Sequence, residues 1–135
     1  MRALVALALV AGCAGELESP ERFSDCPPGF VEEMFATRCA GLCHSSSTLA
    51  AGLDLVSPGV QGRLVGTTSI SLFCEGRMLV APDAVEPQEH LLLDKLSESP
   101  GCGGRMPFGG EALTLTEQAC VRAWVDEALG VEAAP

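Results

Sequence analysis

Two thiols and an imidazole lie within one short segment, Cys39 to His44, of this 135-residue chain. A thiol can form a thioether, pair with a second thiol or bind a metal ion, and an imidazole is a common metal ligand. The spacing is Cys-x3-Cys-His, one residue longer than the Cys-x2-Cys-His pattern at which haem is attached covalently. A covalent haem is therefore the first chemistry that these residues suggest.

The same residues are open to two other interpretations. Cys39 and Cys43 could form disulfides, with each other or with other cysteines. Zinc could also be held by Cys39, Cys43 and His44 with a fourth ligand from elsewhere, although zinc knuckles usually carry such cysteine pairs in duplicate. The bonding state of the two thiols separates these hypotheses.

The N-terminus has the composition of an export signal. Residues 1–12 contain one early charge and an apolar run that is too short to span a bilayer. The tetrad VAGC at 10–13 is similar to the lipobox of bacterial lipoproteins, in which the chain is cut before a cysteine that carries lipid. We expect a signal peptide over 1–12, a lipid anchor on Cys13 and a flexible polar spacer over 13–24. An ordinary signal peptide, cut elsewhere, would leave Cys13 as a thiol.

Lipid on Cys13 would also explain the odd number of cysteines, since it leaves six of the seven for the domain. The expected location is a bacterial membrane surface that faces the periplasm or the cell exterior, where thiols are oxidised. Six cysteines there fit three disulfides, or one haem and two disulfides. Both arrangements remain open at this point.

Four cysteines lie outside the Cys39 to His44 segment, and four allow three connectivities. We favour a bond between Cys26 and Cys120, which would staple the first helix to the last. The second bond would join Cys74 to Cys102, which flank a leucine-rich segment, and would hold the loop that follows it. The other connectivities stay possible.

The chain is acidic, with a formal net charge of −10. Repulsion from phosphate groups argues against nucleic acid as a partner. A protein with a basic docking surface would instead be attracted over a long range, and salt would weaken that attraction. Solubility alone would account for the acidity equally well.

Apolar periodicity predicts helices over 29–38, 58–65, 88–96 and 115–129. The last helix is the clearest, because a Thr114/Glu117 capping box begins it and a glycine follows its end. Its expected buried residues are Cys120, Val121, Trp124, Val125 and Ala128. Short extended stretches are expected at 50–56 and 77–81. The chain thus predicts one mostly α domain over 25–130, with a tail over 131–135.

The helix predicted over 88–96 should have an apolar face of leucines, and an outer face formed by Glu89, Asp94 and Lys95. His90 is expected at the surface beside it. Residues 97–110 are rich in glycine and proline, which predicts a long irregular loop, and long loops in compact domains are usually functional. The loop contains Met106, whereas Met34 and Met78 are expected in the core.

A helix that leads into the Cys39 to His44 segment, a later methionine in an irregular loop and a closing helix with a tryptophan occur in this order in the chain. This order resembles the small monohaem c-type cytochromes over about 28–129. The resemblance implies a cytochrome c-like fold of short helices wrapped around one haem. It also implies thioether bonds at Cys39 and Cys43, with His44 as the proximal ligand. Met106 would be the distal ligand, with His90 as its alternative.

The resemblance implies electron transfer without catalysis by the chain itself, because ligation by Met and His leaves no open coordination site on the iron. We therefore expect a lipid-anchored electron carrier with one covalent haem c and a redox protein as its partner. The alternative is a haem-free lipoprotein on the same helical frame. In that case three disulfides would stabilise the domain, and its role would be binding or structural.

Overall fold

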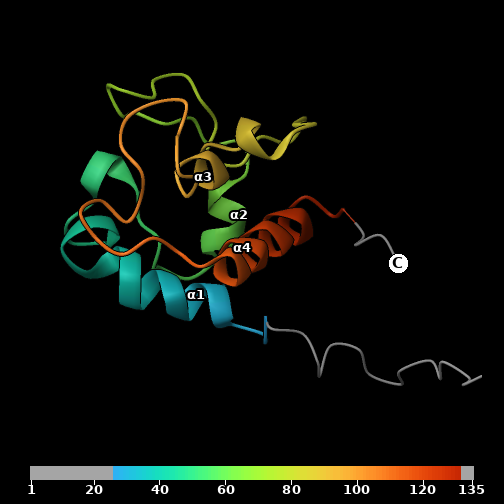
Figure 1. Ribbon diagram of the computed structural model, residues 1–135, viewed down its shortest axis with the longest axis horizontal. Coiled ribbons are helices and arrows are strands. Elements are labelled where there is room, and N and C mark those ends of the chain that lie inside the picture. Colours follow the sequence, from blue (N-terminus) through green and yellow to red (C-terminus); the bar gives the residue numbers. More distant parts are fainter. Residues whose placement is uncertain (1–25, 132–135) are drawn as a thin grey trace, which may run out of the picture.

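The computed structural model describes residues 26–131, and the regular structure within this range is helical (Figure 1). The elements are α1 Phe30–Met34, η2 Phe35–His44, η3 Ala50–Gly52, α2 Val60–Leu64, η4 Pro87–Glu89, α3 Leu91–Asp94 and α4 Leu115–Ala128. Between 26 and 131 no strand forms, and only two isolated bridges pair Val65 with Val80 and Thr68 with Met78. The prediction of a mostly α fold is confirmed.

Several predictions concern residues outside the described range. The signal peptide, the lipid on Cys13, the spacer and most of the tail belong to 1–25 and 132–135. Within the described range, no helix is both long enough and apolar enough to cross a membrane.

The first and last helices pack against each other, and Figure 1 shows α1 and α4 side by side. The rings of Phe35 and Trp124 meet edge to face with 5.5 Å between their centroids. The indole nitrogen of Trp124 donates a hydrogen bond of 2.7 Å to Glu32. A disulfide between Cys26 and Cys120, with an S–S distance of 2.03 Å, joins the same two parts of the chain. The predicted staple between the terminal helices is therefore confirmed.

Helix α4 has the start and the buried face that its sequence predicts. The backbone N–H of Glu117 donates to the Thr114 hydroxyl, and the Glu117 carboxylate accepts from the Thr114 N–H. This exchange satisfies backbone donors that the first turn of a helix leaves without partners. Of the residues expected in the core, Ala128 alone is only half-buried, and Cys120, Val121, Trp124 and Val125 are buried.

The first helix continues beyond its predicted end. Helix α1 runs directly into η2, a wider π-helical segment that ends at His44. The backbone leaves helical geometry at Gly41, with φ 11° and ψ −110°, in open space that no neighbouring atom restricts. Segments of π-helix occur frequently at functional sites. The prediction that a helix leads into Cys39 is confirmed.

The middle of the chain departs from the sequence predictions in two places. Residues 50–56 begin with the 3-10 turn η3 instead of an extended stretch. The helix predicted over 88–96 is divided at His90, whose ψ of 114° is extended, into η4 and α3. A proline and a capping box made by Glu86 and Glu89 fix η4 as a separate turn, so α3 begins anew at Leu91.

This division changes which side chains are buried. His90, expected at the surface, is only 5% exposed, and its Nδ1 accepts a hydrogen bond of 3.1 Å from the Ala81 N–H. Asp94, expected to face solvent, is 6% exposed. Conversely, Met78 is 41% exposed and does not belong to the core, whereas Met34 is buried as predicted. The irregular loop over 97–110 is confirmed.

Candidate cofactor site

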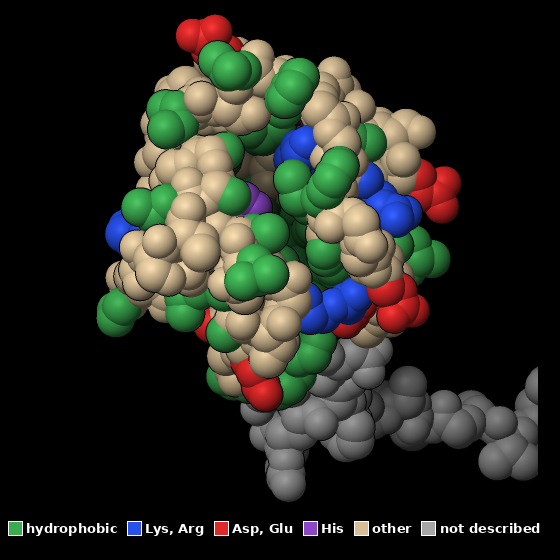
Figure 2. Space-filling view, turned by 90° about the vertical axis from the view of Figure 1, so that its left-hand side faces the viewer, with side chains coloured by type: hydrophobic (Ala, Val, Ile, Leu, Met, Phe, Trp, Pro, Cys, Tyr) green, Lys and Arg blue, Asp and Glu red, His purple; other side chains and the backbone are tan. Residues whose placement is uncertain are grey.

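A cavity of about 640 Å³ opens on one face of the molecule. It is lined by side chains from η2, from residue 79 and from within the segments 51–55, 67–74, 91–96 and 103–110. Figure 2 shows hydrophobic side chains around the hollow, with lysine or arginine side chains at its rim. The volume lies within the range of about 300–1,000 Å³ that is typical of small-molecule and cofactor sites.

The four predicted site residues line this one cavity. Cys39, Cys43 and His44 reach it from η2, and Met106 reaches it from the irregular loop at the opposite end of the sequence. Met106 is half-buried against the core, and its backbone N–H donates a hydrogen bond of 2.7 Å to the Lys95 carbonyl. The fold therefore brings the thioether of Met106 to the same cavity as the thiols and the imidazole of the distant Cys39 to His44 segment.

His90, the alternative distal ligand, does not line the cavity. Its ring is buried behind α3, with Nδ1 already bonded to the backbone of Ala81. Burial also lowers the pKa of the His90 imidazole, so the ring is neutral at pH 7. Its position is that of a structural residue.

Cys39 and Cys43 are not paired in the structure, whereas the other four described cysteines are. The second predicted disulfide, between Cys74 and Cys102, is confirmed with an S–S distance of 2.05 Å. Cys39 is half-buried, and this burial raises the pKa of its thiol, although the adjacent Arg38 opposes the shift. The Cys39 side chain is therefore a neutral thiol at pH 7 and lacks the features of an activated nucleophile.

The imidazole of His44 has an unusual environment. Its Nδ1 is the only buried side-chain nitrogen or oxygen, among those of residues 26–131, without a hydrogen-bond partner. The backbone is well held at this point, because the His44 carbonyl accepts a bond of 2.9 Å from the Leu55 N–H. A buried polar atom without a partner costs about 1–3 kcal/mol. Because the atom has almost no accessible surface, it does not open onto the cavity, which His44 lines with its other atoms.

The cavity is basic in an otherwise acidic protein. Its only charged lining residues are Arg38 and Lys95, and no aspartate or glutamate of the described chain lines it. Arg38 donates to the Glu117 carboxylate at 2.6 Å and to the Glu111 carbonyl at 3.0 Å. Lys95 donates to the Cys102 carbonyl at 3.1 Å, and burial lowers the pKa of its ammonium group. The wall thus suits a ligand that is mainly apolar and carries negative charge.

The zinc interpretation gains no support from this geometry. Within 26–131, no group of three or more His, Cys, Asp or Glu side chains could hold a metal ion. A haem iron needs only its axial ligands from the protein, since the porphyrin supplies the others. That requirement is compatible with His44 on one wall and Met106 on another.

Arg38 and Lys95 also line the cavity, although no site role was predicted for either from the sequence. Arg38 directly precedes Cys39, and this adjacency was the available signal. No signal in the sequence pointed to Lys95, because an unbroken helix over 88–96 would direct its side chain to solvent. The new start of α3 at Leu91 instead places it against the cavity.

No protein-family model matches the chain, and neither a curated protein nor a solved structure shows a significant match to it. We therefore infer the function from the cavity and from the residues that line it.

Proposed function

We propose that this chain is an exported electron-transfer protein with one covalently attached haem c, tethered to a bacterial membrane through lipid on Cys13. The observation that carries the proposal is that Cys39, Cys43, His44 and Met106 line one cavity. When bound, haem c supplies a reversible one-electron couple. The proposal assigns the chain no catalytic residue.

The lining residues match the parts of a haem. The unpaired thiols of Cys39 and Cys43 are available for two thioether bonds. The His44 imidazole and the Met106 thioether are the axial ligands typical of electron-transfer haems with a raised reduction potential. The apolar wall suits the macrocycle, and the two cationic side chains suit its two carboxylates.

The haem-free alternative also has a specific observation in its favour. The cavity is open and mainly apolar, so a small apolar anion could enter it without any bond to the thiols. Three disulfides, the two in the structure and one between Cys39 and Cys43, would then stabilise the domain, and its role would be binding or structural. The chemical state of Cys39 and Cys43 distinguishes this alternative from the proposal.

The decisive experiment expresses the full chain in a bacterium with haem-maturation machinery. We expect haem staining at the mass of the chain on a denaturing gel, and a c-type reduced-minus-oxidised spectrum. Replacement of both Cys39 and Cys43 by serine should abolish the staining, because no thioether can form. Absence of covalent haem from the wild-type chain contradicts the proposal, and a Cys39–Cys43 disulfide in its place would favour the alternative.

The distal ligand is tested with two methionine variants. Met106→Ala should lower the reduction potential and open the iron to added imidazole, because it removes a ligand from the cavity wall. Met78→Ala is the matched control, since Met78 is 41% exposed and does not line the cavity. Equal spectra and potentials for both variants would assign the distal position to another residue.

Anchoring and partner choice are separate parts of the proposal. Mass spectrometry of the N-terminal peptide should find lipid on Cys13, and a peptide that still carries its leader would refute the anchor. The net charge of −10 favours a redox partner with a basic docking surface. The rate of electron transfer to such a partner should fall as salt concentration rises.

A further inference from the structure

Met106 lies in a segment that is fixed at both of its ends to the end of α3. At one end, the Gly101 N–H donates to the Asp94 carboxylate oxygens at 3.1 and 3.0 Å. At the other, the Met106 N–H donates to the Lys95 carbonyl at 2.7 Å. We name residues 101–106 the bracketed loop. Because Asp94 and Lys95 are consecutive, a single point of the fold holds both ends of this loop.

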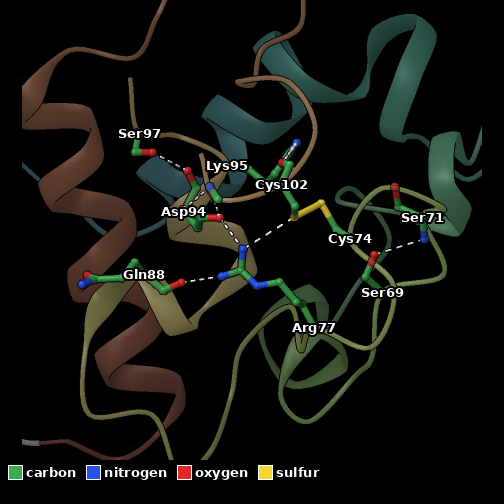
Figure 3. Close-up of a disulfide and its surroundings, with 10 residues drawn as sticks. Ser69, Ser71, Cys74, Arg77, Gln88, Asp94, Lys95, Ser97 and Cys102 are labelled. Carbon is green, nitrogen blue, oxygen red and sulfur yellow. Dashed lines mark hydrogen bonds and ion pairs between the residues drawn. A yellow bond between two sulfur atoms is a disulfide. The ribbon is translucent and has the colours of Figure 1, made fainter. Parts of the chain in front are cut away.

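Asp94 is held in turn by Arg77 (Figure 3). The two side chains form an ion pair, and the Asp94 side chain is only 7% exposed. The guanidinium also donates to the Gln88 carbonyl and approaches the Cys102 sulfur at 3.5 Å. A buried carboxylate is tolerated when charge and hydrogen bonds satisfy it, as they do here. The arrangement fixes Asp94 in one position beside the bracketed loop.

A covalent bond reinforces this arrangement within the bracketed loop. Cys102 is bonded to Cys74, which is buried and lines the cavity. The carbonyl of Cys102 also accepts a hydrogen bond from the Lys95 ammonium group at 3.1 Å. Since residues 97–110 contain no helix or strand, these contacts replace the regular hydrogen bonding that would otherwise order the segment.

We infer that Asp94 is a positioning residue for Met106, which holds the bracketed loop so that the methionine stays on the cavity wall. The inference rests on the proposed function, in which Met106 is the distal ligand. Asp94 does not line the cavity, so it acts only through the loop. Removal of its charge weakens the hold on Arg77 and on the Gly101 N–H together. The loop then opens more often, and Met106 spends less time in its ligand position.

The test compares Asp94→Asn with Asp83→Asn, in which an exposed carboxylate is changed in the same way. The first readout is hydrogen exchange of the Met106 amide, which needs no haem. The second is the affinity of the haem-loaded chain for added imidazole, with Met106→Ala as its upper limit. We expect the exchange rate and the imidazole affinity each to rise about tenfold in Asp94→Asn, because both are proportional to the population of the open loop. Both should stay unchanged in Asp83→Asn. Covalent haem should remain in both variants.

The inference would be overturned if Asp94→Asn had the same Met106 amide exchange and the same imidazole affinity as the wild type. Wild-type chain without covalent haem would instead contradict the proposed function, and amide exchange would still test the bracketed loop. If Asp94→Asn does not fold, Arg77→Lys replaces it, because lysine keeps the charge beside Asp94 but loses the second donor to the Gln88 carbonyl. Arg77→Lys should shift both readouts in the same direction, and wild-type values would again overturn the inference.

Discussion

Two of the walls of the cavity are built in different ways. One wall is η2, a helical continuation of α1. Helix α1 packs on α4, and the Cys26–Cys120 disulfide joins the chain just before α1 to α4. We call η2 the helical wall. The other is the loop wall, residues 97–110, which has no regular structure and is held by Asp94 and by the Cys74–Cys102 disulfide.

The difference lies in what must break before each wall moves. The helical wall belongs to the core around Phe35 and Trp124, so it should move only with global unfolding. The loop wall depends on a few polar contacts and one disulfide, which can open locally at a lower free energy. We therefore expect changes in the helical wall to lower global stability. Side-chain truncations in the loop wall should mainly alter access to the cavity, whereas loss of either disulfide should lower global stability because a disulfide restricts the unfolded chain.

The two disulfides give the largest expected effects. The Cys26–Cys120 bond joins residues 94 apart, and the Cys74–Cys102 bond joins residues 28 apart. Replacing both cysteines of a pair by alanine should lower the free energy of unfolding by about 4.7 kcal/mol for the first pair and about 3.6 kcal/mol for the second, from loop-closure entropy. Urea unfolding of matched samples measures both values.

Hydrogen exchange of the Met106 amide should show the opposite order. Loss of the Cys74–Cys102 bond releases the bracketed loop directly, whereas loss of the Cys26–Cys120 bond acts at the other wall. A larger effect of the Cys26–Cys120 pair on Met106 exchange, relative to its effect on global unfolding, would contradict the separation of the two walls.

Two phenylalanines that line the same cavity give the next contrast. Phe35 of the helical wall is 1% exposed and packs on Trp124, and Phe108 of the loop wall is 80% exposed. Phe35→Ala should lower the free energy of unfolding by about 3–5 kcal/mol, because it leaves a cavity in the core. Phe108→Ala, its matched control, should change that free energy by no more than about 0.5 kcal/mol. Similar losses in the two variants, measured by urea unfolding, would show that both walls belong to one cooperative core.

The helical wall could be predicted from the sequence, because its determinants are local. Apolar spacing predicted the first helix, and adjacent residues defined the segment from Cys39 to His44. The capping box predicted the start of α4. These signals each span a few residues, which is the range over which periodicity and capping act. The positions of the helices also made a staple between Cys26 and Cys120 the favoured pairing.

The loop wall could not be predicted in the same detail, because its determinants are contacts between distant residues. The burial of Asp94 depends on Arg77 from another segment, and the burial of His90 depends on the Ala81 N–H. Periodicity treats both as outward-facing polar residues. The sequence did predict an irregular loop that contains Met106. The contacts of Asp94 and Lys95 that hold the bracketed loop became visible only in the structure.

The smallest effect expected concerns His90, whose buried ring precedes α3, the helix that ends at Asp94. Burial lowers the pKa of the His90 imidazole below its usual 6.5, Arg122 adds to this, and Asp126 and Glu89 oppose it. Just below pH 6.5, the His90 imidazole is therefore protonated in the unfolded chain but still neutral in the folded chain. Stability conferred by the neutral ring is complete above about pH 7 and is lost as the pH falls through 6.5 toward the lowered pKa.

The matched variant is His90→Asn, whose side-chain oxygen can accept the Ala81 N–H without titrating in this range. Urea unfolding at about pH 7.5 and about pH 5.5, on either side of the usual histidine pKa, should show a smaller loss of stability in the variant than in the wild type. Because His90 directly precedes α3, the loss should be accompanied by a lower protection factor of the Met106 amide, which is exchange corrected for the intrinsic rate at each pH, in the wild type alone. Equal losses in the two proteins would mean that His90 does not couple protonation to the loop wall.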